Sequence, residues 1–386
     1  MFSWNTGAFA LLVFQCFVAS FTTLLNNQRK TNRNKHFFHE YNPKFTLSLS
    51  TMVLSLSQPE DEIRKKQQAT LIRRGQIEEQ LMSKNQSPIL FQEPTKTDET
   101  NDVAEVSKGS YYGKILQTEG VVRIDNVLSS KVADCMRDYV TDLKRQSTRD
   151  IRHHQVKPED RFAKVLLNSN RCDLMIPLGP KPVHDALREV LCCNESSLVR
   201  QTIENLIGLD STLYELSCLI SDPGSQRQNV HPDHPCQDDE GGNGEKNNPS
   251  LLTCFIALQD ITCNMGPTVW IPKTHFRTAH KQFQRIRVED ILDSESPKDK
   301  LLKNSPSVVG ILPKGSSVIF DSRLLHCGTA NTSETSRALF YFSFKNAEIG
   351  FPGNVGSIGY GLDSANVRLG ELCDEIHKRE KKNECL

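Results

Sequence analysis

Asn229-Val230-His231-Pro232-Asp233-His234 is the stretch from which the interpretation of this chain starts. Side chains alternate between two faces along a strand, so His231 and Asp233 point the same way while Pro232 points the other way. An imidazole and a carboxylate on one face are two members of a His/His/carboxylate facial triad, the ligand set of non-haem Fe(II). The stretch therefore predicts a metal site whose third ligand comes from elsewhere in the chain.

His326 is the best candidate for that third ligand. It lies in the segment Ser322-Arg-Leu-Leu-His-Cys327, and Arg337 follows it by eleven residues at the start of the apolar run RALFYFSF. A guanidinium binds a carboxylate through two parallel hydrogen bonds, so Arg337 suits an anionic ligand beside the metal. Each residue alone has a plainer explanation, as a loop or core histidine or a surface charge. Their order and spacing together favour one shared site.

Four further stretches, taken with these residues, resemble the phytanoyl-CoA dioxygenase family of Fe(II)- and 2-oxoglutarate-dependent oxygenases. They are Glu119–Ser129 (EGVVRIDNVLS), Phe255–Ile261 (FIALQDI), Met265–His275 (MGPTVWIPKTH) and Lys314–Asp321 (KGSSVIFD). The resemblance runs from about Gly113 to about Asn346.

The resemblance implies a function and a set of site residues. His231, Asp233 and His326 are expected to hold Fe(II), with Arg337 on the distal carboxylate of 2-oxoglutarate. The enzyme is then expected to use O2 to hydroxylate or desaturate a C–H bond of a small molecule, releasing succinate and CO2.

Three more residues are candidate contacts of 2-oxoglutarate: Gln228, Phe255 and Thr329. The family often has Trp where this chain has Phe255, and a hydroxyl residue two positions after the distal histidine, where this chain has Gly328. Thr329 can replace that hydroxyl only through a local shift of the chain. Gln228 lies three residues before His231 and is the least supported of the three.

The predicted fold is mainly β with flanking helices. Helices are expected at about 129–144, 181–193 and 198–207, and short strands at 121–124, 213–220, 228–233, 251–258, 268–271, 317–320, 324–327 and 338–344. Many short strands after leading helices indicate a sheet sandwich or jelly roll. The family resemblance makes the core a double-stranded β-helix of the cupin kind, in a domain spanning 109–375.

The N-terminal region is predicted to be a targeting sequence. Residues 1–21 contain an apolar run followed by Ala19-Ser20, as in a signal peptide, and residues 22–58 are basic, rich in hydroxyls and poor in acids, as in a transit peptide. Together they resemble the two-part targeting sequence of complex algal plastids. We expect passage into the secretory pathway and on to a plastid, with secretion or retention in the endoplasmic reticulum as the alternative.

The remaining segments are predicted to lie outside the core. Residues 59–108 are charged and polar and are expected to be a linker, in which Glu60–Lys84 could form an exposed helix, and residues 376–386 are expected to be a charged tail. No transmembrane segment is expected in the mature chain.

Composition narrows the function further. The formal net charge is zero, which argues against nucleic acid as a partner. The twelve cysteines show no zinc-site spacing and favour a reducing compartment. The expected partner is a small-molecule substrate, with acyl-CoA, amino acids and alkaloid or terpenoid metabolites as candidates; oligomeric state and disulfides stay open.

Two other function classes are kept as alternatives. A dinuclear metallohydrolase would use the His/Asp site, but this chain has Asn229 where its motif has the first His. A metal-free β-helix binding protein would keep the fold without catalysis. Dependence of activity on 2-oxoglutarate separates the oxygenase from both.

Overall fold

The computed structural model describes residues 65–90, 108–163, 170–192, 197–234, 236, 248–283, 296–349 and 366–384. The predicted signal peptide and transit-like segment lie outside the described residues. Within the described ranges, every helix is too short or too polar to cross a membrane.

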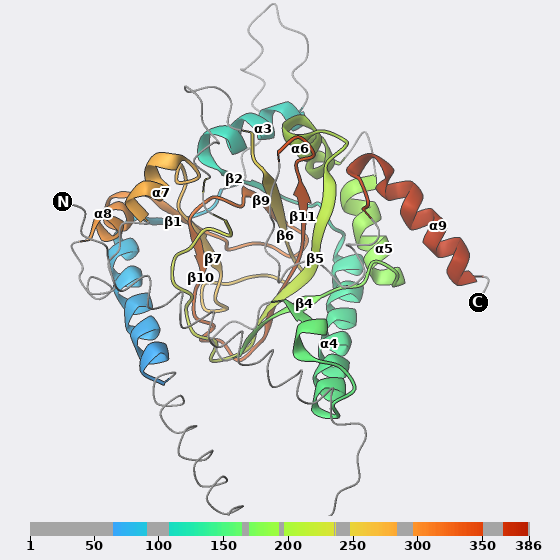
Figure 1. The fold of residues 1–386 in the computed structure, drawn as a ribbon, viewed down its shortest axis with the longest axis horizontal. Coiled ribbons are helices and arrows are strands. Elements are labelled where there is room, and N and C mark those ends of the chain that lie inside the picture. The colour runs from blue at the N-terminus through green and yellow to red at the C-terminus, as the bar shows by residue number, and fades with distance from the viewer. Residues whose placement is uncertain are drawn as a thin grey trace, which may run out of the picture. The chain divides into compact units, whose positions relative to one another are not determined.

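Two β-sheets form the centre of the fold (Figure 1). The major sheet has the order β2 (Val121–Ile124), β9 (Ser317–Asp321), β6 (Leu251–Ala257), β11 (Arg337–Lys345), β5 (Thr212–Ser221), β4 (Arg171–Met175) and β3 (Phe162–Ala163). The minor sheet has the order β1 (Gln86–Pro88), β8 (Ser307–Val309), β7 (Thr268–Trp270) and β10 (His326–Gly328). Neighbouring strands are antiparallel except β1 and β8. The predicted mainly β fold with a double-stranded β-helix core is confirmed.

Helices cover the outer face of the major sheet. They are α3 (Lys108–Glu119), α4 (Ser130–Arg152), α5 (Lys181–Leu187) and α6 (Leu198–Ile207), while α9 (Leu372–Glu384) contacts the turns at Arg188–Cys192 and Leu369–Glu371. Two short helices, α7 (Arg277–Phe283) and α8 (Pro297–Asn304), lie beside the minor sheet. Single turns complete the described structure: η1 (Ser83–Asn85), η3 (Pro158–Asp160), the π-helical η4 (Arg188–Cys192) and η6 (Leu369–Glu371).

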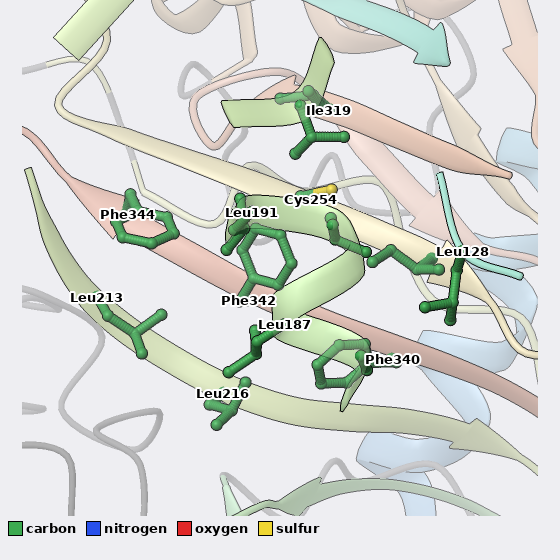
Figure 2. Packing of buried hydrophobic residues seen from close by; sticks show 14 of the residues in the cluster. Leu128, Leu187, Leu191, Leu213, Leu216, Cys254, Ile319, Phe340, Phe342 and Phe344 are labelled. Atoms are coloured by element: carbon green, nitrogen blue, oxygen red, sulfur yellow. The ribbon is translucent and has the colours of Figure 1, made fainter. Parts of the chain in front are cut away.

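Strand β11 shows why the major sheet is buried on both faces. Phe340, Phe342 and Phe344 alternate along it and pack into the core beneath the helices (Figure 2). Leu339 and Tyr341 point the other way, into the space between the sheets. Burying a phenylalanine side chain contributes about 1.5–3 kcal/mol. The unbroken apolar run is therefore the sequence of a central strand with two packed faces.

A glycine fixes how the first helix of the domain meets the sheet. Gly120 has φ +79° and ends α3, its N–H donating to Leu116 O at 2.9 Å. A Cβ there would lie 2.4 Å from His275 Nδ1 and 2.7 Å from Leu324 Cδ1. Only glycine allows this left-handed turn so close to the segment that leads into β10.

Residues 65–90 correct the expectation of a linker over 59–108. Residues 65–82 are helical, and Arg74, Glu78 and Met82 on this helix are buried. Strand β1 then extends the minor sheet by pairing with β8. The polar composition was misleading because the charged side chains of this helix are paired inside the protein.

Helix α9 likewise corrects the expectation of a free tail over 376–386. Ile376 is buried in the main core, and Glu380 forms an ion pair with Arg188 at 2.6 Å. A disulfide joins Cys373 of this helix to Cys192.

Candidate active site

Backbone pairing places two histidines side by side. The N–H of His231 donates to His326 O at 2.9 Å, and the N–H of His326 donates to His231 O at 2.9 Å. Residues that exchange both bonds in an antiparallel pair lie directly opposite each other with their side chains on one face. The ring centroids are accordingly 4.7 Å apart.

Asp233 completes the group. Its N–H donates to Ser322 O at 2.9 Å, which holds it on the same face as His231. Its Oδ1 lies 3.5 Å from Nε2 of His326. His231, Asp233 and His326 offer ligand atoms within 4.8 Å of one another, and no other His, Cys, Asp or Glu in the described chain joins such a group. The Asp233 side chain is 34% exposed against 6% for His326, so the group opens to solvent on the aspartate side.

Each imidazole is oriented by a backbone carbonyl. Nδ1 of His231 lies 2.7 Å from Asn229 O, and Nδ1 of His326 lies 2.8 Å from Leu324 O. A carbonyl oxygen only accepts hydrogen bonds, so each Nδ1 carries a hydrogen, and in the neutral imidazole each Nε2 then keeps its lone pair. This tautomer is the one that metal-binding histidines use.

Burial and neighbouring charges shift the pKa values of His231, His326 and Asp233. Burial, with the nearby charge of His326, lowers the pKa of His231 to about 4. Burial also acts to lower the pKa of His326, but the charge and hydrogen bond of Asp233 outweigh it and raise that pKa. Desolvation would raise the pKa of Asp233, yet His326 holds it below its ordinary value. At neutral pH the site therefore offers a neutral imidazole at His231 and an ionised carboxylate.

Two arginines lie in one row on the inner face of the major sheet. Arg337 of β11 and Arg171 of β4 each pair with Ser221, from opposite sides of β5. Residues paired across neighbouring strands share a face, so both guanidinium groups enter the space between the sheets. Arg337 Nη2 donates to Ser221 Oγ at 3.0 Å, and Arg171 Nη2 donates to Thr329 O at 2.8 Å.

These guanidinium groups are buried without a compensating charge. Arg337 is fully buried and Arg171 is 6% exposed, and neither forms an ion pair within the described residues. Nε of each, and Nη1 of Arg171, have no hydrogen-bond partner there. Burial and the charge of Arg171 lower the pKa of Arg337 to about 9, and burial lowers that of Arg171 to about 10. Because unpaired buried charges are strongly unfavourable, this row fits an anionic ligand.

Gly328 explains how the Arg171 side chain fits against β10. A Cβ at Gly328, two residues after His326, would lie 2.5 Å from Arg171 Nη1 and 2.7 Å from Gln228 Oε1. The glycine that stands in place of the family's hydroxyl residue thus makes room for a guanidinium.

The other predicted contacts have structural partners of their own. Gln228 Oε1 accepts from Gly328 N at 2.9 Å, and Thr329 Oγ1 donates to Pro267 O at 2.8 Å. Phe255 packs against Phe320 with ring centroids 5.0 Å apart. A role for Gln228, Phe255 or Thr329 in binding 2-oxoglutarate stays a prediction.

Sequence reasoning missed β4 and the residues it carries. Beyond Arg171, it brings Asp173 into the space between the sheets, where Tyr341 Oη donates to Asp173 Oδ2 at 2.7 Å. Burial raises the pKa of Asp173 to about 7, and the charge of Asp233 adds to the effect. The signal was an alternation in which two charged residues face away from Cys172 and Leu174.

Comparison with known proteins decides the family. The sequence model described as "Phytanoyl-CoA dioxygenase (PhyH)" matches residues 116–339, more than half of the chain. The chain belongs to the phytanoyl-CoA dioxygenase family. It is therefore a 2-oxoglutarate-dependent oxygenase that uses Fe(II), 2-oxoglutarate and O2, and the predicted family, enzyme class and cofactors are confirmed.

Several solved structures are similar to this member of the phytanoyl-CoA dioxygenase family. The non-heme α-ketoglutarate-dependent carbocyclase SnoK from nogalamycin biosynthesis has 16% identity and a TM-score of 0.41, covering 66% of this chain and 88% of that one. AviO1 from Streptomyces viridochromogenes Tue57 has 13% identity and a TM-score of 0.43, covering 64% and 99%. HygX from Streptomyces hygroscopicus, with nickel and 2-oxoglutarate bound, has 15% identity and a TM-score of 0.41, covering 63% and 88%. No curated protein matches the sequence.

The residues of this phytanoyl-CoA dioxygenase family member are suited to bind Fe(II) and 2-oxoglutarate, which its family uses. Two Nε2 lone pairs and a carboxylate suit Fe(II), which takes imidazole and carboxylate ligands in a facial triad. The arginine row, which has no ion-pair partner among the described residues, suits a dicarboxylate.

Proposed function

We propose that His231, Asp233 and His326 hold the Fe(II) of this oxygenase, and that Arg337 and Arg171 bind the distal carboxylate of 2-oxoglutarate. The observation that supports this most is a pair of buried guanidinium groups on the inner face of the major sheet that have no ion-pair partner among the described residues, together with a His/Asp/His group formed by β10 and the segment paired with it. Iron, 2-oxoglutarate and O2, when bound, supply the oxidation of a C–H bond with release of succinate and CO2. The substrate is a small molecule that is hydroxylated or desaturated.

The protein's own residues act by orientation and charge. Asn229 O and Leu324 O engage the Nδ1 atoms of the two imidazoles, which leaves the Nε2 atoms to bind the metal. Ser322 O holds Asp233 through its backbone, which leaves both carboxylate oxygens free of that bond. The two guanidinium groups would form charge-assisted hydrogen bonds with a carboxylate, and that contact would remove their unfavourable isolation.

Metal binding tests this assignment. Wild type, His231→Ala, Asp233→Ala and His326→Ala are titrated with Fe(II) under anaerobic conditions, with His153→Ala as the control because His153 is exposed. We expect each ligand variant to lose Fe(II) affinity and 2-oxoglutarate-dependent succinate formation, while the control keeps both. Unchanged Fe(II) affinity in the three ligand variants would overturn the assignment.

We also propose that the chain enters the secretory pathway, with a plastid as its destination. The composition of residues 1–58 supports this, and so does the Cys192–Cys373 disulfide. A fluorescent protein fused after residue 58 tests it in an algal cell with complex plastids. Plastid fluorescence supports the proposal, and fluorescence confined to the cytosol contradicts it.

A further inference from the structure

The chain segment that carries His231 pairs with β10 through an isolated β-bridge, and its other edge is covered by no strand in the described structure. Peptide groups along a strand point alternately to its two sides. Those of His231 point toward β10, so those of Val230 point away from it. On that side, Val230 N donates to Glu78 Oε2 at 2.6 Å, and Val230 O accepts from Lys298 Nζ at 3.5 Å. The side chains of Glu78 and Lys298 thus form the hydrogen bonds to the Val230 backbone that a neighbouring strand would form in a sheet.

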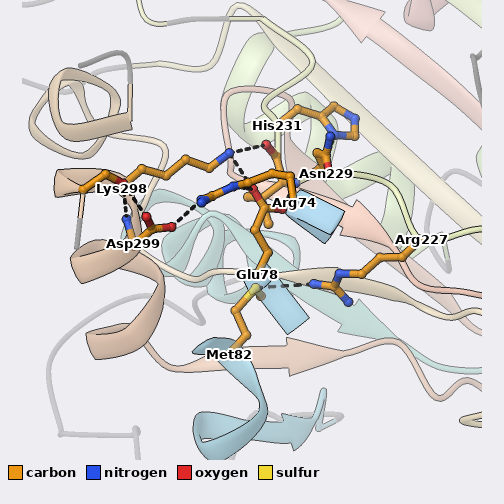
Figure 3. A network of polar contacts seen from close by, with 10 residues as sticks. Arg74, Glu78, Met82, Arg227, Asn229, His231, Lys298 and Asp299 are labelled. Atoms are coloured by element: carbon orange, nitrogen blue, oxygen red, sulfur yellow. Dashed lines mark hydrogen bonds and ion pairs between the residues drawn. The ribbon is translucent and has the colours of Figure 1, made fainter. Parts of the chain in front are cut away.

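Glu78 belongs to a buried network of four charges (Figure 3). Its Oε1 accepts from Lys298 Nζ at 2.7 Å and from Arg74 Nε at 3.0 Å, while Arg74 Nη2 contacts Asp299. None of the four side chains is more than 7% exposed. Two cations balance two anions, so each residue depends on the others for charge compensation.

The helix of residues 65–82 is fitted closely to the segment before His231. Gly75 lies so near that a Cβ would be 3.4 Å from Asn229 Oδ1. Further along the helix, Met82 Sδ accepts from Arg227 Nη2 at 3.5 Å. Because contacts occur at both ends of the segment, the helix supports 227–230 along its length.

We propose that Glu78 is a positioning residue of the iron site. It fixes the free edge of the segment through Val230 and thereby sets where Nε2 of His231 lies. The helix that carries Glu78 precedes the family match at 116–339. A segment outside the matched region therefore supports the iron site of the oxygenase. This inference rests on the proposed role of His231 as an iron ligand.

A pair of charge-balanced double variants isolates the hydrogen bond to Val230. Glu78→Gln/Lys298→Met and Glu78→Leu/Lys298→Met both leave Arg74 paired with Asp299. They differ in that glutamine offers Val230 N an acceptor and leucine does not. Fe(II) affinity is measured anaerobically, together with the visible absorption of the Fe(II)–2-oxoglutarate complex, at a temperature where circular dichroism shows both folded.

We expect the leucine variant to bind Fe(II) about 10–100-fold more weakly than the glutamine variant, the range seen when residues that support metal ligands are replaced. Its Fe(II)–2-oxoglutarate absorption should shift as well, which a loss of stability alone does not cause. Equal Fe(II) affinity and equal spectra in the two variants would overturn the inference.

Single variants decide the matter if the leucine variant does not fold. Glu78→Gln is compared with Glu79→Gln, because Glu79 is the next residue on the same helix and is exposed. We expect several-fold weaker Fe(II) binding only for Glu78→Gln, since a neutral amide is a poorer acceptor than a carboxylate. Equal affinities contradict the inference. If wild type binds Fe(II) without involving His231, the proposed function fails instead.

Discussion

Replacing Arg171 by methionine tests the arginine row, because this substitution keeps much of the side-chain volume and removes the charge. Arg171 Nη2 donates to Thr329 O at 2.8 Å and to Gln226 O at 3.2 Å, and its other two nitrogens have no hydrogen-bond partner among the residues that the structure describes. Its unused donors are therefore available for a ligand.

The expected loss of 2-oxoglutarate affinity follows from the charged hydrogen bonds that its carboxylate would no longer make with Arg171. Losing one partner of a buried charged pair costs on the order of 2–5 kcal/mol, and 1.4 kcal/mol is tenfold in affinity. Arg171→Met should thus raise the Kd for 2-oxoglutarate by about 30-fold or more. The ligand-free protein should respond differently: two bonds to carbonyls are lost, but Arg337 is relieved of a neighbouring charge. Its free energy of unfolding should change by no more than about 1 kcal/mol, since these effects oppose each other.

Calorimetric titration of 2-oxoglutarate into the Fe(II)-loaded protein without O2 measures the first quantity, and urea unfolding measures the second. Arg200→Met is a matched control, because Arg200 is also buried and bonds carbonyls, at 3.0 Å to Leu369 O, outside the site. It should lower stability and leave 2-oxoglutarate affinity unchanged. The reasoning is refuted if Arg171→Met binds 2-oxoglutarate as wild type does, or if both variants lose affinity equally.

Four other outcomes are expected. Arg337→Ala should weaken 2-oxoglutarate binding at least tenfold in calorimetry while Fe(II) affinity stays the same, because the guanidinium lies in the arginine row and outside the ligand group; a change in Fe(II) affinity alone would count against it. A chain begun at residue 59 should bind Fe(II), whereas one begun at residue 108 should not, since the latter lacks Glu78; equal Fe(II) binding would show the helix to be dispensable. Cys373→Ser should lower the free energy of unfolding by about 2–5 kcal/mol in urea and leave Fe(II) affinity intact, and an unchanged midpoint would show that the disulfide adds no stability. The pKa of Asp173 is raised to about 7 in the folded protein against about 4 in the unfolded chain, so its contribution to stability is present below about pH 4 and is lost as pH rises to about 7. Asp173→Asn should remove that decline in the free energy of unfolding of the ligand-free protein. Identical profiles of unfolding free energy against pH for wild type and variant would contradict this.

The proposed ligand residues, which the structure brings together, could be singled out from the sequence because their signals are local or carried by family motifs. His231 and Asp233 need only the two-residue alternation of a strand to share a face. His326 and Arg337 lie in apolar strand segments whose order resembles the family. Their meeting in space required the backbone bridge between His231 and His326, which no periodicity reveals.

Arg171 and Glu78 show what sequence reasoning could not reach. Arg171 acts through the register of three strands and through a glycine, Gly328, that is 157 residues away in sequence. Glu78 lies in a segment whose charge resembles that of a solvated linker, because the composition of a segment does not tell whether its ions are paired inside the protein. In both cases the deciding partners are distant in sequence.

Diffraction from crystals of the protein with Fe(II) and 2-oxoglutarate, recorded without O2 at the iron absorption edge, tests the central claim most directly. We predict an anomalous peak within bonding distance of His231 Nε2, His326 Nε2 and an Asp233 oxygen, with the distal carboxylate of 2-oxoglutarate bound by Arg171 and Arg337. An iron peak away from these three residues, or a carboxylate that contacts neither arginine, would contradict it.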